Sequence, residues 1–474
     1  MSSLLIKYVI TYVVFVLLST AQWFHRKFHK VEIDQFLYHL ERSSENVIKA
    51  DFPLINSAIK NCVLAPLVYA LLFLVLVFMA ERVLKKISRQ FSLSATLYSP
   101  VSIVISMALG VIYFLNLNIQ LANPFVENRD WVAHFYAEPQ VLSAPDKKRN
   151  LVLIYAESME KSLESLYPND HLFDSLSFKN HAPVSFGSFH QLTDTGWTIA
   201  GMTSSQCGIP LKPLGIFNGD NIGESTTKFM PNAKCLGDVL KEYGYKNVFI
   251  GGASSDYSGK NLFLETHGYG EIYGRSEFKK MNSEMAMNAW GANDDELFKF
   301  AKEKFLKLKA ENNPFNLTLL TLGMHFPDGF LSPSCPSRYG DYRDPILCNS
   351  FLIKDFVDFI KANEGAIDTD IVIVGDHLTM KASIAKALEH KSDRSIFNLF
   401  ISRDKDETPN RAHINHFDLF PTILQQLNFE LKDGRAGLGC SGFDQVNCSS
   451  ISTVNQINDK LHKYSSFYES LWTN

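Results

Sequence analysis

Three long apolar segments with almost no charge fill the first 120 residues, and they restrict the fold more than any other feature of the chain. They cover about 4–24, 62–80 and 97–117, and each approaches the roughly 20 residues that an α-helix needs to cross a bilayer. A cleaved signal peptide is the alternative for the first segment, but the two apolar segments that follow it favour a retained anchor. We therefore expect a transmembrane anchor of three helices over residues 1–120.

The basic residues between the second and third segments predict the orientation of this anchor. The sequence ERVLKKISRQ contains Arg82, Lys85, Lys86 and Arg89 beside a single acid, and short loops rich in lysine and arginine stay in the cytoplasm. The N-terminus then lies inside, whereas the loop 25–60 and everything beyond the third segment lie outside. We expect a multi-pass protein of the inner (cytoplasmic) membrane whose C-terminal domain is periplasmic.

The cysteines agree with an oxidising compartment outside the cytoplasm. Six of the seven lie beyond residue 120 and fall into pairs that are close in sequence: Cys207 with Cys235, Cys335 with Cys348, and Cys440 with Cys448. An even number of cysteines in close pairs is typical of disulfides. The alternative, a zinc ribbon, needs C-x-x-C spacings that the sequence lacks. The remaining Cys62 lies in an apolar segment, where we expect it to be an inert packing residue.

Two shorter regions separate the anchor from the rest of the chain. In the loop 25–60, Ile33, Phe36, Leu37 and Leu40 have the spacing of one face of a short helix. We expect this face to pack on the membrane surface or on the C-terminal domain. Residues 121–148 have the composition of a juxtamembrane linker, whose aromatic side chains suit the lipid interface.

From residue 149 to 474 the pattern changes to short apolar runs separated by helical stretches. The runs LVLIYAE, NVFIGGA, FNLTLLTL, DIVIVGD and IFNLFIS are continuously apolar, as are strands buried on both faces. Helices are expected over 233–243 and 294–309. Strands that alternate with helices predict an α/β domain with a central, mainly parallel sheet flanked by helices. In such sheets the active site lies at the carboxyl ends of the strands.

Four polar residues stand at or near these predicted strand ends. One run ends at Glu157, another ends at Asp376 and is followed by His377, and a third leads to His325. A single acid at such a position is often only a helix cap, but two carboxylates and an imidazole together suit Mn²⁺ or Zn²⁺. Three protein ligands and one open position are typical of a catalytic metal. The sequence therefore predicts a metal site at Glu157, Asp376 and His377.

Thr198 is the candidate nucleophile. It lies in TDTGWTIAGM, just before a predicted helix start, where backbone N–H groups and the helix dipole favour an anion. A metal-bound hydroxyl at this position loses its proton near neutral pH and can attack phosphorus. The chemistry leaves an alternative open, in which Thr198, Thr203 and Ser204 are ordinary capping hydroxyls.

Together these motifs resemble the alkaline phosphatase/sulfatase superfamily. The resemblance rests on Glu157 in YAES, Thr198 in GWTIAGM, His325 in LGMHFPDGF, GDH at 375–377 and HFDLFPTIL at 416–424. More specifically, the motifs are similar to those of its membrane-bound lipoteichoic acid synthases and phosphoglycerol transferases, including those that modify periplasmic glucans. The similarity covers roughly 145–440.

This resemblance implies the fold, the cofactor and the reaction. It implies an alkaline phosphatase/sulfatase-like domain in which Glu157, Thr198, Asp376 and His377 bind one divalent ion, Mn²⁺ in the first place and otherwise Zn²⁺ or Mg²⁺. Thr198 is then the nucleophile that forms a phosphoglycerol-threonine intermediate. His325 is implied to contact the head group, and Lys260 in YSGKN is implied to contact the phosphate. The implied donor is phosphatidylglycerol, which leaves as diacylglycerol, and the implied acceptor is an envelope glycan.

The sequence also separates this reaction from its alternatives. A sulfatase needs a C-x-P-x-R or S-x-P-x-R nucleophile, and Cys207 is followed by Gly-Ile-Pro without the arginine. A phosphoethanolamine transferase acting on lipopolysaccharide or another envelope glycan is an alternative, although HFPDGF around His325 favours glycerol. A non-catalytic membrane module for binding or regulation is another alternative, against which the intact set of site residues argues. The net charge of −4 and the lack of a long basic tract argue against a nucleic-acid partner.

Overall fold

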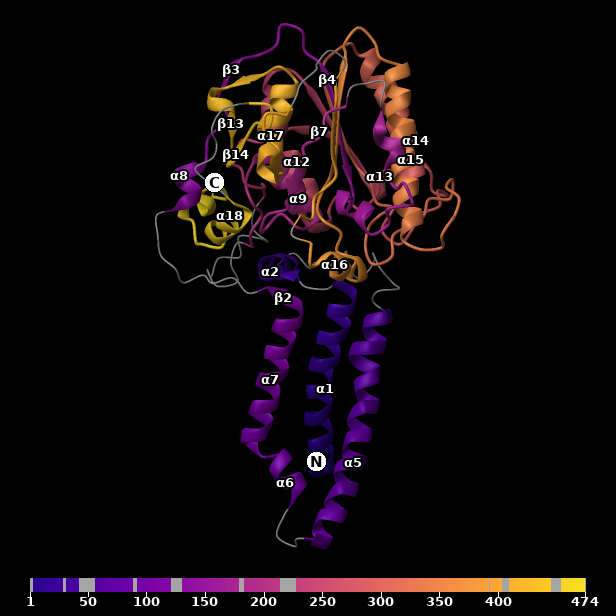
Figure 1. Cartoon of the computed structure of the whole chain (residues 1–474), viewed down its shortest axis with the longest axis vertical. Helices are drawn as coiled ribbons and strands as arrows, with labels where there is room; N and C mark the ends of the chain where they lie inside the picture. The colour runs from indigo at the N-terminus through magenta and orange to yellow at the C-terminus, as the bar shows by residue number, and fades with distance from the viewer. Residues whose placement is uncertain are drawn as a thin grey trace.

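The computed structural model describes residues 3–28, 31–41, 56–87, 92–120, 130–178, 183–213, 227–391, 393–402, 409–444 and 453–473. Three long helices form a bundle, and an α/β domain lies at one end of it (Figure 1). These helices are α1 (Ser3–Phe28), α5 (Ala65–Ile87) and α7 (Pro100–Asn118), with the short α6 (Leu93–Leu97) before the third.

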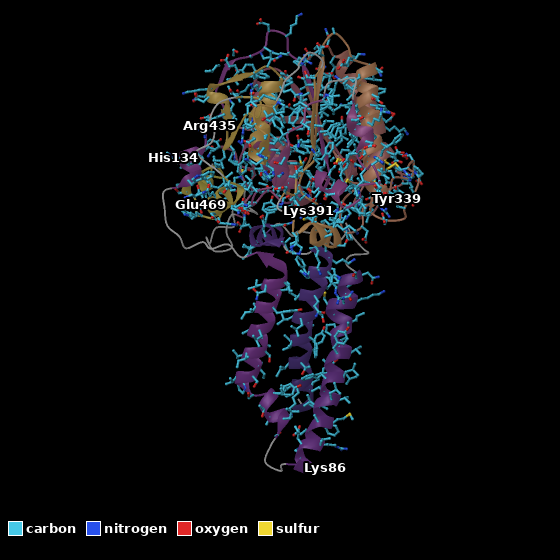
Figure 2. The ribbon with its side chains drawn as sticks, in the orientation of Figure 1. Lys86, His134, Tyr339, Lys391, Arg435 and Glu469 are labelled. Atoms are coloured by element: carbon cyan, nitrogen blue, oxygen red, sulfur yellow. A yellow bond between two sulfur atoms is a disulfide. The ribbon has the colours of Figure 1, made fainter. Side chains whose placement is uncertain are left out.

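The bundle has the length and surface of a membrane-spanning unit. Its stretches Leu4–Phe28, Asn56–Lys86 and Pro100–Leu117 are each long and apolar enough to cross a bilayer. Large apolar side chains point outward from it, for example Leu76 and Val101, which are 64% and 68% exposed. Lys86 lies at the end of the bundle farthest from the α/β domain (Figure 2). The expected cytoplasmic loop and the α/β domain therefore begin at opposite ends of the bundle.

A six-stranded sheet forms the centre of the α/β domain, in the order β10-β9-β4-β8-β6-β7. All neighbouring strands are parallel except β10, which runs antiparallel to β9. The strands are β4 (Asn150–Ala156), β6 (Lys246–Gly251), β7 (Tyr269–Tyr273), β8 (Phe315–Leu320), β9 (Thr369–Gly375) and β10 (Asn398–Ile401). Five of these strands were expected, and β7 was not.

Helices cover both faces of this sheet, which is why its strands are continuously apolar. Leu151, Leu153 and Tyr155 of β4 point into one hydrophobic core, and Val152 and Ile154 point into the other. The first core includes residues of α9 (Thr198–Cys207), α11 (Leu236–Glu242) and α17 (His416–Gln426), and the second includes residues of α14 (Asp294–Ala310) and α15 (Arg343–Ala362).

Shorter elements complete the domain and its junction with the bundle. They are β1 (Val31–Glu32), α2 (Ile33–Glu41), β2 (Ile119–Gln120), α8 (Trp131–Phe135), β3 (Val141–Ser143), β5 (Ser188–His190), α12 (Lys260–Thr266), α13 (Arg275–Met281), α16 (Ala382–Leu388), β11 (His413–Asn415), β12 (Glu430–Leu431), β13 (Arg435–Ala436), β14 (Gly439–Cys440), α18 (Val454–Leu461) and α19 (Ser466–Ser470).

The expected amphipathic helix of the loop 25–60 is α2, and it packs on the α/β domain. The Tyr38 side chain is 2% exposed, its hydroxyl donates to the Ser258 carbonyl oxygen at 2.8 Å, and its ring centroid lies 6.0 Å from that of Trp197. Of the other side chains on the expected apolar face, those of Phe36 and Leu40 lie outside the described residues.

Residues 121–148 were expected to form a linker, but those that the structure describes, from residue 130 onward, pack on the α/β domain. Val132 is buried in the first core, with Trp131 and Phe135 packed against it, and β3 pairs with β12. These aromatic side chains therefore pack on the α/β domain, and residues 121–129 lie outside the described residues.

Two of the three expected disulfides lie in the described part of the chain. Cys207 bonds to Cys235, and Cys335 bonds to Cys348, which confirms both predicted pairs. The third expected pair includes Cys448, which lies outside the described residues. Cys62 is a free, buried cysteine, as expected.

We expect the double variant Cys207→Ala/Cys235→Ala to lose stability, because the disulfide closes a loop whose ends are 28 residues apart. A loop of this length corresponds to about 3–4 kcal/mol of unfolding free energy in the chain-entropy description. Denaturant unfolding followed by tryptophan fluorescence measures the loss, with Cys62→Ala as the control that removes a thiol but no bond. Labelling of Cys207 by a thiol reagent in unreduced, native protein would contradict the prediction.

Candidate active site

The register of the central sheet brings three strand ends together. Ala156 pairs with Gly375, and Tyr155 pairs with Leu320 and Val374, so the residues after β4, β8 and β9 leave the sheet side by side. The Glu157 N–H donates to Thr321 Oγ1 at 3.0 Å, and the Ser158 N–H donates to Asp376 Oδ1 at 2.8 Å. These hydrogen bonds fix the turns that carry the predicted metal ligands.

Glu157, Asp376 and His377 meet in one buried cluster. Their candidate ligand atoms all lie within 4.8 Å of one another. His377 Nε2 lies 3.4 Å from Glu157 Oε1 and 3.4 Å from Asp376 Oδ2. The His377 Nδ1–H donates to the Leu378 carbonyl oxygen at 2.8 Å, which leaves Nε2 as the lone-pair nitrogen that faces the carboxylates. The structure thus brings together the three residues that the sequence singled out.

The hydrogen bonding of this cluster fits a divalent cation. Asp376 Oδ2 and His377 Nε2 are buried and have no hydrogen-bond partner in the described part of the chain. Buried polar atoms without partners are rare in folded proteins, and each one calls for a physical explanation. Two carboxylate oxygens and an imidazole nitrogen are ligands that Mn²⁺ and Zn²⁺ accept.

The charges in this cluster also favour a bound cation. Burial and the neighbouring Glu157 carboxylate raise the pKa of Asp376 to about 7. Burial opposes the charged form of His377, but the Asp376 and Glu157 carboxylates outweigh it and raise its pKa to about 9. Two acids in a buried space thus need a positive charge beside them to stay ionised, and a proton on His377 Nε2 supplies it when no cation occupies that nitrogen.

Thr198 lies at the edge of this cluster and is its most accessible hydroxyl. It is the first residue of α9 and is partly exposed, whereas the residues that follow it in the helix are buried. Its Oγ1 donates to Glu157 Oε2 at 3.4 Å. The residue that caps α9 is Trp197, without a side-chain hydrogen bond. Thr203 and Ser204 have buried hydroxyls with no partner among the described residues, so neither caps the start of this helix.

Gly201 allows α9 to approach the cluster of Glu157, Asp376 and His377 closely. A Cβ atom at this position would lie 2.1 Å from the Asp376 carbonyl oxygen. The same oxygen accepts a hydrogen bond from His416 Nε2 at 2.8 Å, and burial lowers the pKa of His416 to about 4 despite that bond. His416 therefore acts as a neutral donor that holds Asp376 in place. His416 is the first residue of the motif HFDLFPTIL, and the motif alone predicted no role for it.

Lys260 and His325 supply the basic groups beside the carboxylates. Burial lowers the pKa of Lys260 to about 8, although the charges of Glu157 and Asp376 favour its protonated form. Burial also lowers the pKa of His325, against the pull of the Glu157 charge. The His325 ring lies 4.3 Å from the Trp290 ring, centroid to centroid. Trp290 was not predicted, since nothing in its local sequence marks it.

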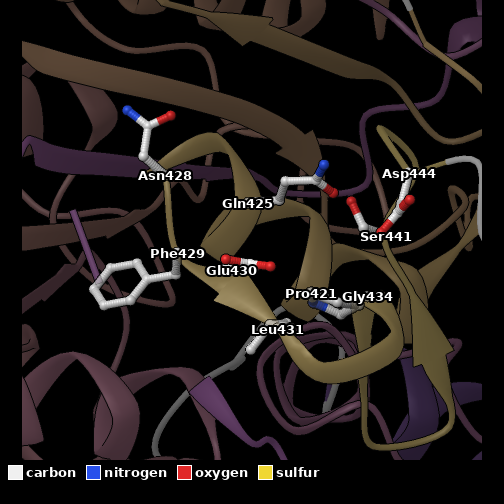
Figure 3. Close-up of a pocket in the computed structure, with 9 residues that line it drawn as sticks. All are labelled: Pro421, Gln425, Asn428, Phe429, Glu430, Leu431, Gly434, Ser441 and Asp444. Atoms are coloured by element: carbon white, nitrogen blue, oxygen red, sulfur yellow. The ribbon is translucent and has the colours of Figure 1, made fainter. Parts of the chain in front are cut away.

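Two other features do not belong to this site. Cys207, Cys235 and His267 also lie close together, but the two sulfur atoms are bonded to each other and His267 hydrogen-bonds to Asp238 and to the Phe229 carbonyl oxygen. A cavity of about 260 Å³ beside α17 and β12 lies away from the bundle, and none of the predicted site residues lines it (Figure 3).

Comparison with known proteins places this domain in a family. The profile of the Sulfatase family matches residues 149–429, which is more than half of the chain. The chain belongs to the Sulfatase family. Its α/β domain has the alkaline phosphatase/sulfatase-like fold, as the sequence motifs led us to expect.

Individual known proteins are similar to this chain over different shares of its length. "Phosphoglycerol transferase I" of Escherichia coli O127:H6 (strain E2348/69 / EPEC) is 36% identical over 328 residues, which cover 67% of this Sulfatase-family chain and 42% of that protein. The chain thus spans about two fifths of the length of the curated relatives that it matches. Lipoteichoic acid synthase LtaP from Listeria monocytogenes is 16% identical with a TM-score of 0.49 and covers 65% of this chain and 80% of its own. Phosphoethanolamine transferase EptA from Neisseria meningitidis is 12% identical with a TM-score of 0.48 and covers 89% and 84%.

Proposed function

We propose that this chain is a membrane-anchored transferase that moves a phosphoglycerol group from phosphatidylglycerol to a hydroxyl of an envelope glycan. The observation that carries the proposal is the partly exposed Thr198 hydroxyl beside the buried cluster of Glu157, Asp376 and His377. The name of the E. coli relatives, phosphoglycerol transferase, supports the choice of group. The missing arginine after Cys207 argues against sulfate-ester chemistry.

Glu157, Thr198, Asp376 and His377 would hold the cation, for which we propose Mn²⁺ before Zn²⁺ or Mg²⁺. A divalent cation at this position lowers the pKa of a bound hydroxyl and offsets negative charge on phosphoryl oxygens. In the first step Thr198 Oγ1 loses its proton and forms a bond to phosphorus, the bond from phosphorus to the diacylglycerol oxygen breaks, and that oxygen takes up a proton. In the second step an acceptor hydroxyl loses its proton and attacks the same phosphorus, the bond from phosphorus to Thr198 Oγ1 breaks, and Oγ1 takes up a proton.

Two basic residues of the site suit the phosphoglycerol part of the donor, which stays bound when diacylglycerol leaves. The charges of Glu157 and Asp376 act on the Lys260 ammonium, which supports a role for it in pairing with a phosphoryl oxygen as negative charge develops there. His325 donates its Nδ1–H to the Phe326 carbonyl oxygen at 2.9 Å, so its Nε2 is available to accept a hydrogen bond from a glycerol hydroxyl.

The anchor fits a donor that is dissolved in a membrane. Three apolar helices would keep the site within reach of the lipid and raise its effective concentration. We propose that the protein lies in the inner membrane with its α/β domain in the periplasm. Two disulfides in that domain support an oxidising compartment.

Purified protein in vesicles of either phosphatidylglycerol or phosphatidylethanolamine, with Mn²⁺, tests the proposed donor. We expect diacylglycerol to be released only from the phosphatidylglycerol vesicles. Release should stop on addition of EDTA and return with added Mn²⁺. Turnover of phosphatidylethanolamine alone would identify a phosphoethanolamine transferase, and no turnover of either lipid with any of the three metals would indicate a non-catalytic module.

A further inference from the structure

A cavity of about 270 Å³ lies where the first membrane helix meets the α/β domain. Phe28 at the end of α1 and Gln35 of α2 form part of its wall, and Gln191, Gly196 and Thr379 of the domain form another part. Figure 1 shows α2 and α16 on the side of the domain that faces the bundle. The cavity adjoins the candidate active site, because Gly196 lies two positions before Thr198 in the chain.

Two amide side chains present unused hydrogen-bonding atoms to this cavity. Gln191 Oε1 accepts the Leu378 N–H at 2.7 Å, which fixes the amide and leaves its Nε2 as a donor with no partner among the described residues. Gln35 is 7% exposed, and its Nε2 reaches only the thioether sulfur of Met380, at 3.5 Å, which is a weak acceptor. Gln35 Oε1 has no partner in the described part of the chain. The cavity thus offers at least one free donor and one free acceptor.

The free donor and the free acceptor together indicate what kind of ligand the cavity can bind. Phosphate and ester oxygens only accept hydrogen bonds, whereas each hydroxyl both donates and accepts. The lining also contains Glu32 and Glu389, and its one arginine, Arg394, pairs with the buried Glu160. An anionic group gains little in such surroundings, but the Phe28 ring offers an apolar face to a sugar ring.

We infer that this cavity is the acceptor subsite, in which Gln35, Gln191 and Phe28 bind a sugar of the glycan and present one of its hydroxyls to Thr198. The inference rests on the proposed function and gives the class of acceptor, a neutral molecule rich in hydroxyls. It also gives the junction with the membrane anchor a part in acceptor choice, because Phe28 and Gln35 come from that junction.

Methyl β-glucoside as a soluble acceptor tests the inference through two readouts on the same protein. One is diacylglycerol release from phosphatidylglycerol vesicles, and the other is phosphoglycerol transfer to the sugar. We expect Gln35→Met, which keeps the side-chain volume and removes both amide atoms, to lower the ratio of transfer to release about fivefold to tenfold through a higher KM for the sugar. Gln425→Met in the distant cavity of Figure 3 is the matched control and should leave the ratio unchanged.

Each outcome decides the matter. Equal losses of release and transfer in Gln35→Met would mean that the cavity holds the lipid donor, and release and transfer that both stay at wild-type rates would mean that it holds no substrate; both results overturn the inference. If Gln35→Met does not fold, Phe28→Leu tests the same cavity and should lower the same ratio. If the wild-type protein releases no diacylglycerol, the proposed function fails separately. Saturation-transfer NMR with methyl β-glucoside then decides on the cavity: binding that Gln35→Met or Phe28→Leu weakens supports it, and absence of binding overturns it.

Discussion

Thr198→Ala is expected to lower phosphoglycerol transfer by about a thousandfold or more. The variant removes the hydroxyl that lies 3.4 Å from Glu157 Oε2, and loss of a nucleophile removes the covalent route that divides the reaction into two steps. Turnover is measured as diacylglycerol release, and mass spectrometry of wild-type protein incubated with phosphatidylglycerol should find the added phosphoglycerol on the peptide that contains Thr198.

Thr198→Ser provides the control for this prediction. It keeps a hydroxyl at the start of α9 and should retain measurable turnover. Full activity in Thr198→Ala, or a phosphoglycerol adduct on a different residue, would show that Thr198 is not the nucleophile.

Gly201→Ala is expected to inactivate the protein although Gly201 itself is neither a proposed metal ligand nor a proposed substrate contact. A Cβ atom there would lie 2.1 Å from the backbone carbonyl oxygen of Asp376, and backbone atoms cannot move aside as a flexible side chain can. Helix α9 and the turn after β9 must then separate, which displaces Thr198 from Glu157, Asp376 and His377. Overpacking of this kind costs about 1–3 kcal/mol of stability, and a misplacement of about 1 Å at a catalytic group costs about a hundredfold in rate.

Gly270→Ala is the matched control, since a Cβ atom at Gly270 on β7 meets nothing within 4 Å. Activity and thermal unfolding are compared for both variants. Equal behaviour of Gly201→Ala and Gly270→Ala would show that the close approach of α9 to Asp376 is unimportant.

The central strands could be predicted from sequence because each lies between two helical layers and is apolar throughout. The strand β7 was missed because it lies at the edge of the sheet, and its sequence YGEIY carries a glycine and a glutamate. The antiparallel direction of β10 was not predicted either, since a run such as IFNLFIS does not reveal which way it joins the sheet.

The sequence predicted those site residues that lie at strand ends or in recognisable motifs. Glu157, Asp376 and His377 follow apolar strands directly, so their meeting point follows from the parallel order of the sheet. Trp290 and Gln191 lie in loops, where position depends on tertiary contacts that leave no periodic pattern. The role of Gly201 depends on a backbone oxygen 175 positions later in the chain, which no local pattern could indicate.

Tyr38 makes the interior of the α/β domain depend on a segment that precedes the whole of that domain in the chain. Its phenol closes the core over Trp197 and donates to the Ser258 carbonyl oxygen, yet it lies only ten positions after Phe28, the last residue of α1. Trp197 and Ser258 come later in the chain, so α2 is synthesised before the residues that it packs against. A soluble fragment that starts at residue 130 would keep Glu157, Asp376 and His377 but would lack this phenol. Helix α2, which follows the first apolar helix, thus completes the core of the α/β domain.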